Sequence, residues 1–301
     1  MRSISLLALL ASAGCTGPGL LTDGSSVSFG TTGTGALREG TTLPVRGDGY
    51  FVPKRWRERR RNYGTDELVR LMVRAARRVS REYRNSLLSV ADLSPRGGGP
   101  TPEHRSHRSG RDVDLLFYHL DEKGKPVKAT QMIPFDENGY SVSPASQATS
   151  QPAKTAAAEQ PAGSSPTSQP AEPPPVRKLD VPRTWALVRA LVLDPEVPVQ
   201  WIFIGRPVAR MLLAHARRIK EPAHIVELAA AAMQHTPAHM DHFHVRIFCS
   251  PSDLALGCLN TGSRRPPKRD IRRIDSPPAN SLPEGVLARF GLGPIKLLGR
   301  F

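Results

Sequence analysis

The sequence predicts an α+β fold, in which a small antiparallel sheet is flanked by helices and interrupted by a long disordered insertion. Helical periodicity, strand-like alternation and one stretch of low complexity occur in the same chain, and the helices and strands do not alternate regularly. Helices are expected over 66–83, 182–193, 207–219 and 223–234, and strands over 90–93, 112–119, 197–204 and 242–248.

The first expected helix begins after Thr65, which can act as its N-cap. Asp66 and Glu67 follow in the first turn, where negative charge is favourable. Apolar residues then recur at helical spacing, at Leu68, Leu71, Met72, Ala75, Ala76, Val79 and Tyr83. The other face carries Arg70, Arg74, Arg77, Arg78 and Arg81. This pattern is typical of an amphipathic surface helix with a solvated basic face.

The expected strands are identified from short apolar runs and from alternation of polar and apolar residues. The apolar run Val197 to Ile204 is short and bounded by Pro and Gly, as a buried strand would be. Residues 112–119 and 242–248 alternate between polar and apolar side chains, which indicates strands with one buried face. Trp185 falls on a helical face and Trp201 in the apolar strand, so both are expected in the core rather than in contact with a substrate.

The insertion is expected at 141–178. From Ser141 to Pro175 the chain consists of Pro, Ala, Ser, Gln and Thr except at five positions, and it contains no aromatic residue. Such a segment cannot bury enough apolar area to offset the entropy of ordering. A linker between two domains is the alternative, but candidate site residues fall on both sides of it. We therefore expect one domain over 46–262, preceded by a tether and lead-in at 16–45 and followed by a basic Pro- and Arg-rich tail at 263–301.

The first 15 residues resemble a bacterial export signal. Met1 and Arg2 precede the apolar run Ile4 to Ala11, which is too short to span a bilayer. Gly14-Cys15 resembles a lipobox, in which Cys15 would be acylated, whereas Ala11-Ser12-Ala13 fits ordinary signal cleavage. We favour a lipoprotein of the periplasm with a membrane anchor at Cys15, because that thiol is otherwise unpaired in an oxidising compartment.

Cys249 and Cys258 enclose a short loop of small and polar residues. Outside the cytoplasm two such cysteines are expected to form a disulfide, with a buried pair of free thiols as the alternative.

The charge balance favours anionic surroundings. The 42 Lys and Arg residues exceed the 27 Asp and Glu residues and give a formal net charge of +15. The basic runs lack the interleaved aromatic residues that stack on bases, and the export signal argues against a nucleic-acid partner.

Five of the nine histidines lie in two short windows. The first window holds His104, His107, Gly110, Asp112 and Asp114, and the second holds His239, Asp241, His242 and His244. Because alternate residues of a strand face the same way, His242 and His244 are expected on one face of their strand and Asp112 and Asp114 on one face of theirs.

Clusters that combine histidine with aspartate on two strands indicate a metal or catalytic site. Gly110 would let the chain turn, so that the loop residue His107 can reach the strand residue Asp114. Zinc suits imidazole and carboxylate ligands in a hydrolase, with manganese and iron as alternatives. Asp112 and Asp241 could each orient an imidazole or could form structural ion pairs with Arg111 or Arg246.

These motifs resemble those of the penicillin-insensitive murein endopeptidases, a zinc peptidase family related to the D-Ala-D-Ala metallopeptidases and the lysostaphin-like enzymes. The family's His-x-x-Gly-x-x-x-Asp signature is met by His107, Gly110 and Asp114, and its His-x-His signature by His242 and His244. The low-complexity insertion departs from the family pattern, and some of the family's cysteines have no counterpart here.

The resemblance implies one zinc ion held by His107, Asp114 and His244. It also implies that His242 is an uncoordinated catalytic histidine beside the metal, that His239 is a further active-site histidine, and that His104 lies near the metal. The implied activity is hydrolysis of D-alanyl to meso-diaminopimelate cross-links in peptidoglycan. A D,D-carboxypeptidase acting on stem peptides and a non-catalytic lipoprotein that binds the cell wall are the alternatives.

Overall fold

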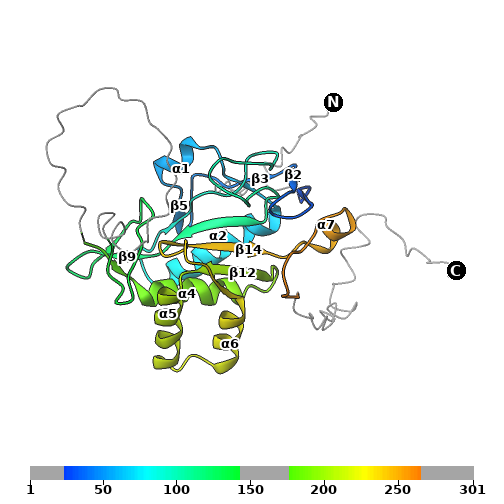
Figure 1. The fold of residues 1–301 in the computed structure, drawn as a ribbon. Coiled ribbons are helices and arrows are strands. Elements are labelled where there is room, and N and C mark those ends of the chain that lie inside the picture. Colours follow the sequence, from blue (N-terminus) through cyan, green and yellow to red (C-terminus); the bar gives the residue numbers. More distant parts are fainter. Residues whose placement is uncertain (1–23, 143–175, 266–301) are drawn as a thin grey trace, which may run out of the picture. The chain divides into compact units, whose positions relative to one another are not determined.

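The computed structural model describes residues 24–142 and 176–265, and it confirms the α+β fold class (Figure 1). The predicted export signal with Cys15, most of the predicted insertion and most of the basic tail lie outside the described residues.

The central sheet has four strands in the order β13, β12, β14, β8. These are β13 (Met233–His235), β12 (Val199–Ile204), β14 (His242–Ile247) and β8 (Asp112–Leu116). The pairs β12–β14 and β14–β8 are antiparallel as expected, but β13 runs parallel to β12. The sheet is therefore mixed, because the last expected helix ends at Ala232 and its final residues continue as the edge strand β13.

The register gives the sheet one apolar face and one polar face. Ile202 pairs with Val245, which pairs with Val113, and all three side chains are fully buried. The next row, shifted by one residue, holds Phe203, His244 and Asp114. Alternation along the strands thus separates a hydrophobic core from a polar site on the opposite face.

The expected helices are confirmed with small shifts at their ends. They are α2 (Asp66–Glu82), α4 (Val181–Val192), α5 (Arg206–Arg218) and α6 (Ala223–Ala232), with the shorter α1 (Lys54–Glu58) and α7 (Pro251–Ala255) in addition. The Thr65 side chain accepts a hydrogen bond from the Leu68 amide, so it caps α2 as predicted. Trp185 of α4 is buried in the core, whereas Trp201 of β12 is only partly buried. In Figure 1, α4, α5 and α6 lie near one another beside β12.

Residues 24–45 are the described part of the expected tether and lead-in, and they contain regular structure. They form β1 (Val27–Phe29), β2 (Ala36–Arg38) and β3 (Thr41–Thr42), and β1 pairs with β2. The buried carboxylate of Asp66 accepts hydrogen bonds from the Ser26 amide, the Ser26 hydroxyl and the Thr41 hydroxyl. Polar bonds at the start of α2 therefore fix part of the expected lead-in.

Short strands complete the fold. They are β4 (Arg46–Gly47), β5 (Tyr50–Phe51), β6 (Tyr63–Gly64), β7 (Leu88–Ser89), β9 (His119–Leu120), β10 (Pro126–Val127) and β11 (Lys178–Leu179). The strand expected over 112–119 ends at Leu116, and β9 begins separately at His119. The two ends of the predicted insertion are ordered, since the Ser141 amide donates to the Arg177 carbonyl and Tyr140 bridges to Lys178.

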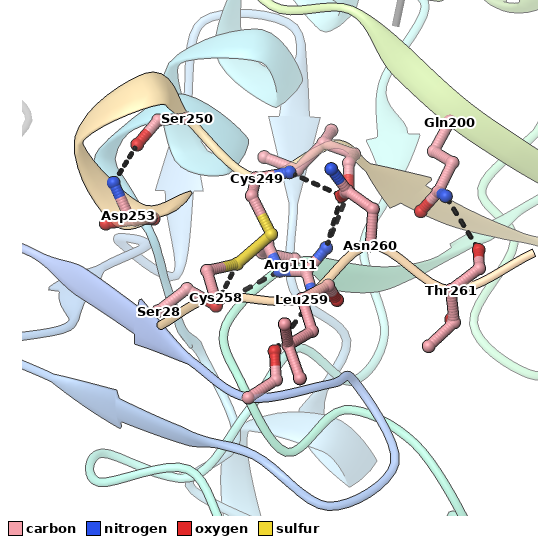
Figure 2. The surroundings of a disulfide bond; sticks show 12 residues. Ser28, Arg111, Gln200, Cys249, Ser250, Asp253, Cys258, Leu259, Asn260 and Thr261 are labelled. Atoms are coloured by element: carbon pink, nitrogen blue, oxygen red, sulfur yellow. Dashed lines mark hydrogen bonds between the residues drawn. A yellow bond between two sulfur atoms is a disulfide. The ribbon is translucent and has the colours of Figure 1, made fainter. Parts of the chain in front are cut away.

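A buried arginine joins the two ends of the described chain (Figure 2). Arg111 is 1% exposed and donates to the Ser28 hydroxyl and to the carbonyls of Ile247 and Leu259. Burial lowers the pKa of Arg111 to about 10, so the side chain stays cationic at neutral pH. The guanidinium has five neutral acceptors in all, because the Asn260 side-chain oxygen and the Gly30 carbonyl also accept from it. These hydrogen bonds hold β1, the end of β14 and the segment after α7 together.

The expected disulfide is present: Cys249 and Cys258 are joined with an S–S distance of 2.04 Å (Figure 2). The bond closes the loop that contains α7, and Gly30 pairs with Cys258 by a backbone bridge. Among the described residues, no helix is long and apolar enough to cross a membrane.

Replacing both cysteines, as Cys249→Ser with Cys258→Ser, should lower the free energy of unfolding by about 2–3 kcal/mol. This is the chain-entropy estimate for a loop of about ten residues. Urea denaturation of the oxidised protein and the double variant measures the difference. The control is wild-type protein denatured in the presence of a reductant, which should show the same loss of free energy of unfolding as the double variant. A loss below about 0.5 kcal/mol would show that the loop is held by the Arg111 contacts alone.

Candidate metal centre

Three atoms from two strands and one loop form a nearly equilateral triangle on the polar face of the sheet. The Asp114 Oδ1 atom lies 3.2 Å from His107 Nε2 and 3.2 Å from His244 Nδ1, and the two nitrogens are 3.2 Å apart. Asp114 and His244 face each other because β8 and β14 pair at this position. All three side chains are almost completely buried.

His107 reaches the triangle from a loop with left-handed backbone. Its φ is 64°, and Gly110 follows with a φ of 76°. A positive φ is uncommon for a residue with a side chain and marks a conformation that the surroundings must hold in place. The Asp112 carboxylate accepts a hydrogen bond from the His107 amide at 3.1 Å. The strand that follows the loop therefore stabilises the conformation of the loop.

The tautomer of His107 follows from its second ring nitrogen. Nδ1 lies 2.9 Å from the Leu93 carbonyl oxygen. A carbonyl oxygen only accepts, so Nδ1 carries the hydrogen and donates it. Nε2 then has a free lone pair, which points into the triangle.

His244 and Arg246 share one buried carboxylate. Asp112 accepts from Arg246 Nε at 2.7 Å and Nη2 at 3.1 Å, and its Oδ2 lies 3.5 Å from His244 Nε2. Burial alone would lower the pKa of His244, but Asp112 and Asp114 raise it to about 9. Asp112 therefore forms the ion pair with Arg246 and also faces the outer nitrogen of His244, so the two roles considered for it from the sequence occur together.

His242 lies beside the triangle and forms a pair with its neighbour. Its Nδ1 is 2.5 Å from Asp241 Oδ1, and its Nε2 is 3.6 Å from Asp114 Oδ1. A carboxylate at Nδ1 favours the tautomer in which Nε2 is free of hydrogen. Asp241 thus orients an imidazole, as one of the two sequence-based alternatives proposed.

His104 lies near the second carboxylate oxygen of Asp114, Oδ2. Its Nδ1 lies 3.9 Å from Asp114 Oδ2, and its ring centroid is 4.3 Å from that of His107. Its Nε2 lies 2.8 Å from Asp92 Oδ2. Asp92 was not among the residues expected at the site. The available signal was a lone carboxylate within the apolar run 90–93, which was expected to form a strand.

His239 also lies close to the second cluster. Its ring centroid is 4.8 Å from that of His242 and 5.6 Å from that of His244. Burial, together with the nearby charges of His242 and His244, lowers the pKa of His239 to about 4. Its Nδ1 is buried and has no hydrogen-bond partner among the described residues. All the histidines of the two windows are thus gathered around Asp114.

The donor atoms fit a bound cation. Both carboxylate oxygens of Asp114 are buried and have no hydrogen bond of acceptable geometry within the described part of the chain. Burial alone would raise the pKa of Asp114, but His107 and His242 hold it well below its usual range. A buried carboxylate needs a positive charge or hydrogen-bond donors close by, and a bound metal ion could supply that charge here. Donor atoms of His104, His107 and Asp114 lie within 4.8 Å of one another, so this group could hold a metal ion.

The sequence comparisons agree with the family resemblance of the two motifs. The model of a family described as penicillin-insensitive murein endopeptidase matches residues 28–162. This span contains Asp92, His104, His107, Asp112 and Asp114, and it ends before the second histidine window. The resemblance to this family is therefore confirmed for the first histidine window.

Individual relatives give the same description. Penicillin-insensitive murein endopeptidases of Escherichia coli O1:K1 and of strain SMS-3-5 are each 34% identical to this chain over 125 residues. The matched part covers 38% of this chain and 43% of each relative. The chain thus spans less than half the length of the curated relatives it matches.

The substitution Asp112→Asn should lower the free energy of unfolding by about 3 kcal/mol, because it leaves Arg246 and His244 without their buried counter-charge. Urea denaturation measures the loss. The matched control is Asp48→Asn, since the pair that Asp48 forms with Arg77 is well exposed and should contribute less than about 0.5 kcal/mol. Equal effects of the two substitutions would contradict the structural role of Asp112.

Proposed function

We propose that this chain is a zinc-dependent peptidase that cleaves D-alanyl to meso-diaminopimelate cross-links of peptidoglycan. The observation that carries the proposal is the triangle of His107 Nε2, Asp114 Oδ1 and His244 Nδ1, with sides of 3.2 Å. A tetrahedral ion bound to nitrogen and oxygen at about 2.0–2.1 Å requires ligand atoms roughly 3.3 Å apart. The three atoms have this spacing.

The ligand set is His107, Asp114 and His244 rather than the group completed by His104. The latter spans up to 4.8 Å, and His104 is bonded through its other nitrogen to Asp92. His244 has its outer nitrogen toward Asp112, so its Nδ1 is available as a ligand. Three protein ligands leave a coordination position open, which is the arrangement of catalytic zinc sites.

When bound, zinc would supply Lewis acidity and make water nucleophilic near neutral pH. His242 is the residue placed to move a proton. Its Nε2 faces the site and its Nδ1 is held by Asp241. It can accept the proton of the attacking water and return it to the amine nitrogen that departs when the peptide bond breaks. The ring centroid of His239 lies 4.8 Å from that of His242, so His239 can limit the orientations that His242 adopts.

The choice of substrate rests on the relatives and on charge. The matched relatives are named as murein endopeptidases, and the net charge of +15 suits an anionic wall polymer. Action on the cell wall requires export, which agrees with the signal-like residues 1–15. We propose the periplasm as the location and Cys15 as the site of a lipid anchor.

Purified mature protein should contain about one zinc ion per chain. His244→Ala and Asp114→Ala should each lose most of it, because each removes one of three ligands. His104→Ala should retain the metal, which separates the two overlapping ligand groups. The exposed His224 of α6 provides the matched control His224→Ala. Elemental analysis after dialysis measures all four variants, and zinc retained by His244→Ala would contradict the ligand set.

Digestion of isolated sacculi should release monomers from cross-linked dimers without trimming monomer stems. His242→Ala should keep its zinc and cleave at least about 100-fold more slowly, because the proton acceptor is lost. Chromatography of the muropeptides separates the possible outcomes. Trimmed stems with intact dimers would indicate a D,D-carboxypeptidase instead. Binding to sacculi without any cleavage would indicate a non-catalytic wall-binding protein.

A further inference from the structure

Asp92 is a buried carboxylate that the proposed ligand set does not use. Its side chain is 1% exposed, and the backbone brings it directly beside the site. The Asp114 amide donates to the Asp92 carbonyl at 2.9 Å, and the Ala91 amide donates to the Asp114 carbonyl at 2.9 Å. The segment after β7 therefore runs along β8, which fixes Asp92 relative to Asp114.

The Asp92 carboxylate connects a cation to His104. Its Oδ2 lies 2.6 Å from Arg59 Nη1 and 2.8 Å from His104 Nε2. A second guanidinium, that of Arg61, is 3.9 Å from the same oxygen and pairs more closely with Glu103. A carboxylate in contact with an arginine is ionised and can only accept hydrogen bonds.

This contact determines which nitrogen of His104 carries the hydrogen. Because Asp92 only accepts, Nε2 of His104 is the donor, and Nδ1 of the neutral ring has a free lone pair. Nδ1 is the nitrogen that faces Asp114, at 3.9 Å from Oδ2. His242 lies near the other carboxylate oxygen of Asp114, Oδ1, and shows the same arrangement with its two nitrogens exchanged. Asp241 holds Nδ1 of His242, and Nε2 faces the site.

We propose that Asp92 is a positioning residue, which holds His104 in the Nε2–H tautomer with Nδ1 toward the site. Two carboxylate–histidine pairs, Asp241–His242 and Asp92–His104, then flank Asp114. His104 then offers a hydrogen-bond acceptor to the attacking water and fixes its orientation. This inference rests on the proposed hydrolytic function of the site, although its first test does not.

The first test reads the tautomer directly, by long-range ¹H–¹⁵N correlation spectra of metal-free protein labelled at histidine. Wild-type protein should show His104 as the Nε2–H form, and His104→Ala assigns the signal by its loss. Asp92→Leu should give a mixture of tautomers. Arg59→Gln is the matched control, because it removes the other partner of Asp92 and leaves the contact with His104. If Asp92→Leu does not fold, Asp92→Asn keeps the shape, removes the charge and should shift the tautomers in the same direction.

The second test is kinetic and uses zinc-loaded protein on a soluble cross-linked muropeptide. Asp92→Leu should lower kcat about 10- to 100-fold with KM and zinc content within about threefold of wild type. The double variant with His104→Ala should be no slower than His104→Ala alone, because Asp92 acts through His104. The proposal would be overturned if the losses of kcat in the two single variants multiply in the double variant. It would also be overturned if the tautomer of His104 is the same in Asp92→Leu as in wild-type protein. Wild-type protein without cleavage activity would refute the proposed function and leave the tautomer test decisive for Asp92.

Discussion

The pairing of β8 with β14 places Asp114 opposite His244, and the rest of the site depends on this register. Neighbouring residues of the two strands fill the core on the other face, with Val113 and Val245 fully buried. A slip by one residue would bring the carboxylate into the core and the valines into the site, so hydrophobic burial fixes the register. The same burial removes the Asp114 carboxylate from water.

The loop that carries His107 shows how the surrounding structure supports this arrangement. Its left-handed backbone is held by the Asp112 carboxylate, which also binds Arg246 and faces His244. Arg111, the next residue back, anchors the first strand and the segment after the disulfide. Parts of the chain far apart in sequence thus converge on the end of β8, which gives the site a rigid base.

Much of this was predictable from residue patterns. Period-2 alternation located β8 and β14, helical spacing located α2, and the clustering of histidine with aspartate located the site. The lead-in at 24–45 was not predictable in this way, because its order comes from hydrogen bonds to Asp66 rather than from apolar periodicity. Asp92 was missed because its only local signal was a lone carboxylate in an apolar run, whereas its role depends on a backbone pairing with β8.

The most direct measurement is the anomalous scattering of crystals of the zinc-loaded protein, recorded on both sides of the zinc absorption edge. We expect one strong peak in contact with His107 Nε2, Asp114 Oδ1 and His244 Nδ1, and none bonded to His104. A peak held by His104 instead of His244, or crystals of fully loaded protein with zinc elsewhere, would contradict this expectation.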